Sequence, residues 1–326
     1  MAATSACRDA GTPVSASTFT PTWLRMLLVA GAMLLSACGG NDASPDLDAA
    51  QLSAAEAGAP TATGDVAADG VRWLNYRRVQ AGMPALRRNP QLDLAAKGHA
   101  NYQQLNDVVT HAEDSRHAGF VAATASERLR AAGFPLLTTS FADGEVIAAT
   151  GAPDGFAAVE GLLGAIYHRY VVLEPMFNAV GAGAAHRDGS FHWLTMNLVG
   201  IKPSGGIAKG SVAVWPLPSQ TRVRTNFFSD QETPDPVPQV DEVGYPVSVH
   251  ANMNTLLHVD RFTLSDPDGK PVEVRQLDAA ADPDTPSSAA ASIPLQPLRS
   301  GTTYSASFAG RVDGQAVERR WQFTTR

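Results

Sequence analysis

The sequence predicts an α+β protein in which an α-β-α layered domain is followed by an all-β domain. Apolar residues recur at helical spacing over residues 69–132 and again over 154–166. The segment 179–199 then contains two apolar runs separated by Asp188-Gly189, which is typical of a β-hairpin. Beyond residue 201 the helical periodicity fades, and short apolar runs alternate with turn segments, as in a β-sandwich.

The first 37 residues have the pattern of a lipoprotein signal peptide. Arg25 precedes an apolar run, residues 26–35, that is too short to span a bilayer. The following Leu35-Ser36-Ala37-Cys38 resembles a bacterial lipobox, in which the Cys38 sulfur is acylated and cleavage makes this residue the first of the mature chain. Gly39 stands where inner-membrane lipoproteins often carry Asp. We therefore expect an envelope protein anchored by lipid, in the outer rather than the inner membrane.

Charge and cysteine content narrow the partners of the mature chain. Loss of residues 1–37 removes two arginines and one aspartate, so the net charge changes from −7 to −8. An acidic protein has no broad attraction for nucleic acid, and acyl chains rather than basic residues must hold it on a membrane. Cys7 leaves with the signal peptide, so the mature chain can form no internal disulfide and depends on core burial.

Composition divides the mature chain into four parts. Residues 38–63 are mostly Ala, Gly, Asp, Ser and Pro, which predicts a disordered tether. The layered domain follows at 64–200. Pro203-Ser204-Gly205-Gly206 opens a linker at 201–216, and the all-β domain occupies 217–326.

Four helices are expected in the layered domain. The first begins near Asp69 and ends at Gly82. Asn89 is a typical N-cap for the second helix, and Pro90 fits its first position. The third covers 126–132, and the fourth begins after the cap Asp154 and includes Ile166.

Seven short motifs in this domain carry a family resemblance. They read, in chain order, L-N-Y-R-R-V-Q-A-G-M-P-A-L, A-A-K-G-H-A-N-Y, T-H-A-E, D-G-E-V-I-A-A, Y-H-R-Y, A-V-G-A-G-A and F-H-W-L-T-M-N-L. Their order and spacing resemble the CAP superfamily of cysteine-rich secretory proteins, antigen 5 and pathogenesis-related proteins, in its secreted bacterial form. The resemblance implies the CAP fold, an α-β-α sandwich with a central cleft. The chain's ending, L-R-S-G-T-T-Y and W-Q-F-T-T, resembles immunoglobulin-like modules of bacterial surface proteins.

The CAP resemblance implies a ligand cleft lined by four side chains. T-H-A-E matches the family's first histidine motif and supplies His111. G-E-V-I matches G-E-N-I and supplies Glu145, with Val146 in place of the usual Asn. Y-H-R matches the helix-borne histidine of bacterial members and supplies His168. His192 stands where animal and plant members carry the histidine of H-Y-T-Q, although bacterial members more often have an aromatic residue there.

These residue types allow three kinds of site. His111 and His168 could bind Zn²⁺ or another divalent cation, although the sequence requires no cofactor. A histidine and a carboxylate could also move protons, or the residues could form a hydrogen-bonded structural cluster. Glu113 and Glu127 are further acids that could reach the cleft, and His99 is expected to be a core histidine. The sequence contains no H-E-x-x-H pair and no G-x-S-x-G elbow, so no catalytic role is assigned.

Three functions follow from these alternatives. The first is binding of a small ligand, such as a lipid, glycan or peptide fragment, and it is favoured because no catalytic motif is assembled. The second is metal-assisted hydrolysis of a peptide or cell-wall substrate. The third is a surface role in adhesion or structure. The sequence does not indicate an oligomeric state.

Overall fold

The structure is a computed structural model, and it describes residues 56–136, 141–203 and 205–326. The predicted signal peptide, Cys38 and residues 38–55 of the predicted tether lie outside the described residues. Within the described ranges, no helix has both the length and the apolar character needed to cross a bilayer.

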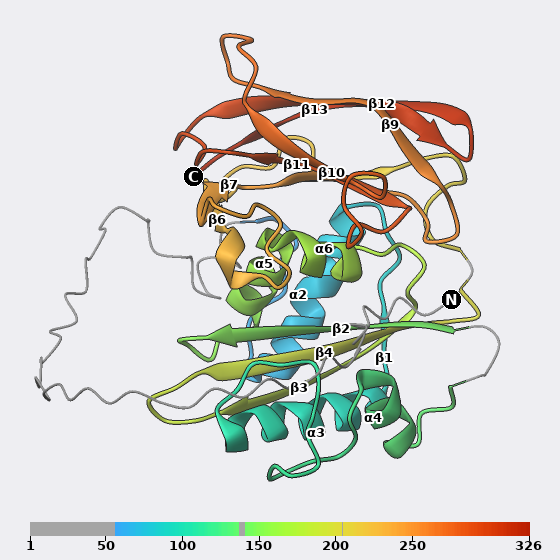
Figure 1. The fold of residues 1–326 in the computed structure, drawn as a ribbon, viewed down its shortest axis with the longest axis vertical. Coiled ribbons are helices and arrows are strands. Elements are labelled where there is room, and N and C mark those ends of the chain that lie inside the picture. Colours follow the sequence, from blue (N-terminus) through green and yellow to red (C-terminus); the bar gives the residue numbers. More distant parts are fainter. Residues whose placement is uncertain (1–55, 137–140, 204) are drawn as a thin grey trace, which may run out of the picture. The chain divides into compact units, whose positions relative to one another are not determined.

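The first domain has the predicted α-β-α layers (Figure 1). Its central sheet has the strand order β1 (Arg87–Arg88), β3 (Ala179–His186), β4 (His192–Ile201) and β2 (Phe141–Thr150). One face of the sheet is covered by α3 (Pro90–Asn106) and α4 (Ala125–Ala131). The other face is covered by α2 (Val66–Gln80), α5 (Gly155–Gly164) and α6 (Ile166–Val172). The predicted hairpin is the antiparallel pair β3 and β4.

Local signals set the helix boundaries. The Asn89 side chain accepts hydrogen bonds from the backbone N–H groups of Gln91 and Leu92 at the start of α3, as expected of an N-cap. Asp154 caps α5 in the same way. The predicted fourth helix is wrong at its end, because the extended backbone of Ala165 terminates α5 and Ile166 begins a separate helix, α6.

Two glycines bring β3 directly onto α3. A Cβ atom on Gly181 would lie 2.2 Å from the backbone nitrogen of Asp93, and one on Gly183 would lie 2.2 Å from that of Lys97. Any side chain at either position would therefore collide with the helix backbone. This close approach fixes α3 against the sheet and with it the residues that α3 contributes to the site.

The second domain is all-β among its described residues, apart from a short 3-10 helix, which confirms the predicted class. One sheet has the order β10 (Val274–Asp278), β11 (Ala289–Pro294), β8 (Val247–His250) and β5 (Ala213–Trp215). A second sheet has the order β13 (Gln315–Thr324), β12 (Thr303–Val312) and β9 (Leu257–Ser265). A small ribbon is formed by β6 (Asn226–Phe228) and β7 (Glu242–Gly244), with the 3-10 helix η1 (Ser229–Gln231) between them. Because β5 pairs with β8, the last part of the predicted linker 201–216 belongs to this domain.

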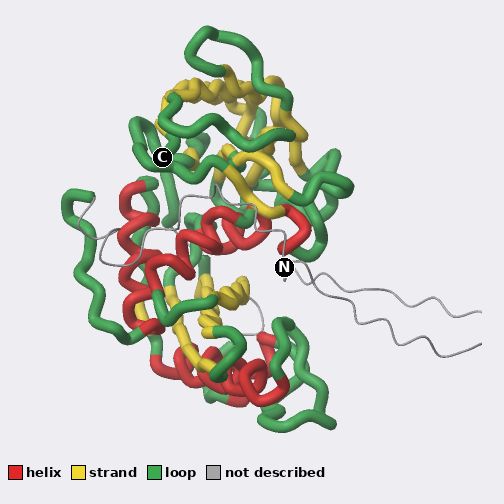
Figure 2. The backbone as a smooth tube through the Cα atoms, turned by 90° about the vertical axis from the view of Figure 1, so that its left-hand side faces the viewer, coloured by secondary structure: helices red, strands yellow, loops and turns green. Residues whose placement is uncertain are grey.

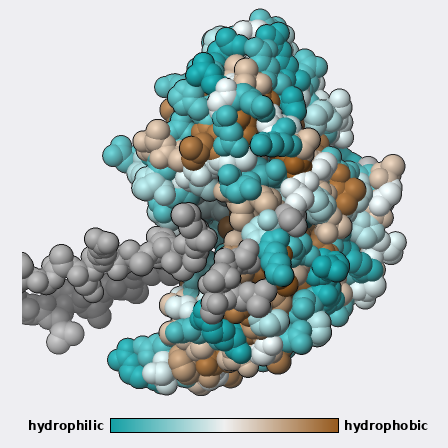
Figure 3. Space-filling model, turned by 90° about the vertical axis from the view of Figure 1, so that its right-hand side faces the viewer, coloured by the Kyte–Doolittle hydropathy of each residue, from teal (hydrophilic) through white to brown (hydrophobic). Residues whose placement is uncertain are grey.

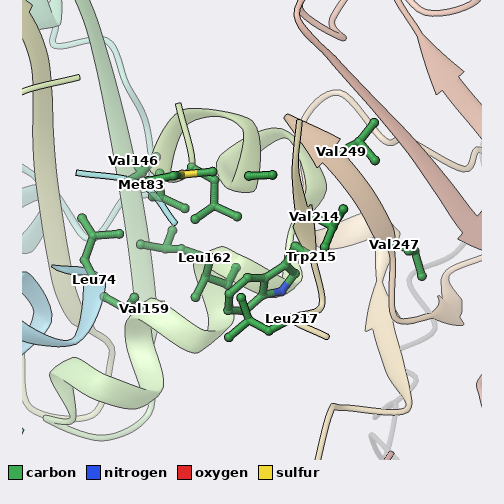
Figure 4. Close-up of a cluster of buried hydrophobic side chains, with 14 of the residues drawn as sticks. Leu74, Met83, Val146, Val159, Leu162, Val214, Trp215, Leu217, Val247 and Val249 are labelled. Carbon is green, nitrogen blue, oxygen red and sulfur yellow. The ribbon is translucent and has the colours of Figure 1, made fainter. Parts of the chain in front are cut away.

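The two domains share one hydrophobic core. Figure 4 shows Trp215 and Leu217 of the second domain beside Leu162 of α5. The same cluster of buried side chains continues from Leu74 in α2 to Phe323 in β13. The tube in Figure 2 shows the helices of this layer lying between the strands of the two domains. The domains therefore pack through α5 and α6 rather than meeting only at a linker.

The described end of the predicted tether also contacts the first domain. Glu56 forms an ion pair with the buried Arg77 of α2, at 2.5 Å. The backbone N–H of Thr63 donates to both carboxylate oxygens of Asp69, at 2.9 and 3.0 Å. Residues 56–63 thus contribute polar contacts to α2, although the sequence predicted a disordered tether over residues 38–63.

Candidate functional site

A buried polar cluster lies between the sheet and the layer formed by α3 and α4. His99 of α3 is fully buried, with its Nδ1 2.8 Å from Glu113 Oε1 and its Nε2 2.6 Å from the carbonyl oxygen of Thr110. Glu113 also accepts hydrogen bonds from the backbone N–H groups of Val121 and Ala122. The pair therefore ties the loop between α3 and α4 to α3.

The hydrogen bonds of His99 define how its ring is held. The carbonyl oxygen of Thr110 can only accept a hydrogen bond, so Nε2 of His99 must carry a proton. Nδ1 of His99 faces Oε1 of Glu113, while Oε2 of Glu113 accepts the backbone hydrogen bonds from Val121 and Ala122. The ring of His99 is therefore held through both of its nitrogens inside the protein.

Glu145 joins this cluster to the surface. It lies on β2 with its side chain only 3% exposed, and both of its oxygens accept from one terminal nitrogen of the buried Arg128, at 2.8 and 2.9 Å. The same arginine nitrogen donates to the carbonyl oxygen of His111, at 2.9 Å. The His111 Nδ1 then lies 3.0 Å from Glu145 Oε1. Arg128 therefore orients both the Glu145 carboxylate and the backbone of His111, the histidine that this carboxylate binds.

The surroundings of Glu145 keep it ionised. Burial acts to raise its pKa, but the hydrogen bond from His111 and the positive charges of Arg128 and His99 outweigh burial, so the pKa of Glu145 lies below its ordinary value of 4.5. An ionised Glu145 accepts a hydrogen bond from the Nδ1–H group of His111. The Nε2 atom of His111 is then the ring nitrogen left for a ligand.

His111 is the exposed end of the cluster. Its side chain is 57% exposed, whereas Glu145, Arg128, His99 and Glu113 beneath it are buried. Large apolar side chains are also exposed nearby in sequence, namely Val109, Phe120 and Val121. Figure 3 shows apolar surface mixed with polar surface at the lower end of the molecule, where α3 and α4 lie in Figure 1. The site is thus a polar group set in a partly apolar surface.

His168 does not join this cluster. It lies on α6, and its Nδ1 is 2.8 Å from Oε1 of Glu232 in the second domain. Gly144 of β2 faces α6, since a Cβ there would lie 2.6 Å from Val171, so the next residue, Glu145, points to the opposite face of the sheet. Among the described residues, no ion pair connects His168 with Glu145. The expected convergence of His111, Glu145 and His168 is therefore wrong for His168, because the histidine binds another carboxylate.

His192 also lies apart from Glu145. It begins β4 and stacks on His186 across the hairpin, with ring centroids 5.4 Å apart. Glu145 is opposite Asn197 in the middle of β4, about 17 Å along the strand from His192 at ~3.4 Å per residue. The expected cleft residue His192 is therefore a hairpin residue in this fold.

The described residues contain no group of three or more His, Cys, Asp or Glu side chains arranged to hold a metal ion. His111 and His168 each contact a different carboxylate, Glu145 and Glu232 respectively. Binding of zinc or another cation at either histidine stays a prediction.

Sequence reasoning missed two members of these sites, Arg128 and Glu232, and the supporting role of His99. Arg128 follows the capping box that Thr124 and Glu127 form at the start of α4, so the Thr-x-x-Glu pattern could have placed it in the first helical turn. Glu127 serves that cap and does not enter the cluster. His99 is the core histidine that was expected, yet it also supports Glu113 and Glu145. The pairing of Glu232 with His168 carries no local sequence signal.

The first domain matches a known protein family. Residues 71–198 match the profile of the cysteine-rich secretory protein family, CAP. An extracellular protein containing an SCP domain from Bacillus anthracis is 26% identical, with a TM-score of 0.34, over 41% of this chain and 40% of that protein. An outer surface protein of Borrelia burgdorferi is 15% identical, with a TM-score of 0.33, over 40% of this chain and 90% of that protein.

The match therefore spans less than half the length of the Bacillus protein. No curated protein matches the chain. The family match extends from α2 to β4 and includes His99, His111, Arg128 and Glu145. The chain therefore contains a domain of the CAP family, and the buried cluster beneath His111 is part of that domain.

Proposed function

We propose that this protein is a lipid-anchored cell-envelope protein whose CAP domain binds a small amphipathic ligand at His111. One observation carries the proposal: an exposed imidazole is held by a buried carboxylate that is itself fixed by a buried arginine. Burying two charges is costly unless they are well paired, so this support favours a precise ring orientation. An exposed histidine with no role in binding would not require a fixed ring orientation.

The surroundings of His111 favour a ligand with polar and apolar parts. Arg128 donates to the carbonyl oxygens of His111 and Ala122, so the loop segments that contain Val109 and Val121 lie near one another. Both valines are about half exposed, at 54% and 42%. An envelope lipid could place its polar group at Nε2 of His111 and its acyl part on this apolar surface. A glycan or a peptide fragment offers less apolar area to cover these side chains.

The anchoring part of the proposal rests on the lipobox at Cys38, and the two solved relatives come from extracellular or surface proteins. Metabolic labelling with a tagged fatty acid tests it directly. Label should enter the wild-type protein and be absent from Cys38→Ser. Equal labelling of both proteins would refute lipid anchoring at this cysteine.

Equilibrium binding tests the ligand site. The full chain with Cys38→Ser, purified without acyl groups, is titrated with envelope lipids in vesicles and separately with muropeptides. Saturable lipid binding should weaken at least tenfold in His111→Ala and in Glu145→Gln. The control is His258→Ala, because His258 is a similarly exposed histidine on β9 with a single carboxylate neighbour, Asp260. Binding to neither ligand set, or binding unchanged in His111→Ala, would refute the proposal.

A second candidate function is hydrolysis, favoured by the same histidine geometry. In both His111 and His168, Nδ1 faces a carboxylate and Nε2 is left for a metal ion or a proton. Metal analysis after exposure to zinc would distinguish this function from ligand binding. A protein that takes up no zinc, and whose His111→Ala and His168→Ala variants keep full biological activity, would exclude the hydrolase.

A further inference from the structure

The second domain contributes a buried carboxylate to the CAP domain. Glu232 follows η1 and is 2% exposed. Its Oε1 accepts three hydrogen bonds from α6: from the backbone N–H of Tyr167 at 2.8 Å, from that of His168 at 3.0 Å, and from the His168 ring at 2.8 Å. One oxygen of one residue thus binds both the backbone and the side chain of the same helical turn.

Glu232 supplies what α6 lacks in its own sequence. Ala165 precedes the helix and has no side-chain atom that could accept a hydrogen bond from the first helical N–H groups. Glu232 accepts two of these N–H groups instead. Its own position is fixed, because its backbone N–H donates to Ser229, whose hydroxyl donates to the carbonyl oxygen of Val240. The carboxylate is therefore held in place before it meets the histidine.

Three consecutive residues of α6 are bound by the second domain. Tyr167 donates its hydroxyl to Asp282, at 3.2 Å. His168 binds Glu232. Arg169 is fully buried and donates to the carbonyl oxygen of Pro246, at 2.6 Å. A domain that served as a spacer would have no reason to hold every side chain of this turn.

The contact with Glu232 also determines the chemical form of His168. An ionised carboxylate only accepts hydrogen bonds, so Nδ1 of a neutral His168 carries the proton and Nε2 keeps its lone pair. The side chain is 22% exposed. Among the described residues, no hydrogen bond to Nε2 is formed. That atom is an oriented acceptor at the surface between the two domains.

We infer that Glu232 is a positioning residue for His168: it holds the imidazole with Nδ1 as the donor to the carboxylate and leaves Nε2 as an oriented acceptor. This arrangement exists only where both domains are docked, because the histidine comes from one and its carboxylate from the other. The inference concerns a different histidine from the proposed lipid site at His111, so either can fail without the other.

Nitrogen NMR of the ring tests the assignment. The full chain carrying Cys38→Ser is labelled with ¹⁵N-histidine and measured above about pH 8, where an ordinary imidazole is neutral. Wild-type His168 should show a protonated Nδ1 and an unprotonated Nε2. Glu232→Gln should keep this pattern, because the amide oxygen can still accept the same three hydrogen bonds. Glu232→Met has a similar volume and no acceptor, so the proton should shift to Nε2, the major form of an unrestrained neutral histidine.

The remaining histidines give an internal control, since their signals should be unchanged in a folded variant. Wild-type protein with the proton on Nε2 of His168 would overturn the inference, even if Glu232→Met did not fold. So would a folded Glu232→Met protein with the wild-type pattern. If Glu232 only capped α6 and did not orient the ring, the protonation pattern of His168 would be the same in every variant. The NMR measurement therefore separates positioning of the ring from capping of the helix.

Discussion

Replacing Arg128 by Met should destabilise the CAP domain far more than its place on a short surface helix suggests. The guanidinium is fully buried and donates to Glu145, to the carbonyl oxygen of His111 and to that of Ala122. Methionine fills most of the volume but donates nothing. The variant therefore leaves the buried Glu145 without its guanidinium partner.

The magnitude follows from the loss of one partner of a buried ion pair, which costs about 3–5 kcal/mol because the remaining charge is uncompensated. Glu145 is 3% exposed and cannot recover its hydration without opening the loop. The double variant Arg128→Met/Glu145→Gln removes both charges. It should therefore be more stable than Arg128→Met alone, despite carrying one more substitution.

Urea denaturation at neutral pH measures these free energies of unfolding. Arg130→Met is the matched control, because Arg130 is an exposed arginine two residues after Arg128 on the same helix. Its effect should stay within about 0.5 kcal/mol. A loss below about 1 kcal/mol in Arg128→Met, or strictly additive losses in the double variant, would refute the claim that Arg128 compensates a buried Glu145.

Three further predictions concern buried groups away from this cluster. Burial raises the pKa of Glu174 to about 7, so the free energy of unfolding of the wild type should fall by up to roughly 3 kcal/mol as pH rises from 4.5 to 7, at 1.36 kcal/mol per pKa unit. Urea titrations of Glu174→Gln should not show this fall. Parallel pH profiles of the two proteins would contradict the prediction. Burial, together with the positive charges of Arg169 and Arg78, lowers the pKa of His250 to about 3, so the free energy of unfolding should fall as pH drops below 6.5. In His250→Gln this fall should be smaller. The same pH dependence in both proteins would count against the prediction. Gly181→Ala should lower the free energy of unfolding by about 3 kcal/mol or more, because its Cβ meets the α3 backbone. The control Gly161→Ala has open space around the new Cβ and should be neutral or stabilised by up to about 1 kcal/mol. Equal effects in thermal or urea unfolding would disprove the close approach of β3 to α3.

Local sequence signals predicted the parts of the fold that local interactions determine. Asn89 with Pro90 begins α3, Asp154 begins α5, and Asp188-Gly189 lies in the turn between β3 and β4. The strand β2 was not predicted. It begins Phe-Ala-Asp-Gly-Glu, and Asp, Gly and Glu are depleted in strands. Pairing with β4 over its whole length stabilises it, which is a long-range effect that no window of the sequence contains.

The site was only partly predictable for the same reason. Motif resemblance identified His111 and Glu145, which the fold brings within 3.0 Å. It also identified His168, but the carboxylate that binds this histidine lies 64 residues further along the chain, outside the segment that matches the family. Arg128 belongs to a short helix whose burial depends on the sheet beneath it. Partners of this kind become visible only when the chain is folded.

The continuous core that joins α5 and α6 to the β-sheets has a consequence for cleavage of the backbone. A protease cut between Lys202 and Gly210 would break the connection before β5 while leaving Trp215, Tyr245 and Arg169 in their contacts. The two fragments should then migrate together through gel filtration and part only in denaturant. A nicked molecule would keep its shape, and the chain could be severed at this point without releasing either half.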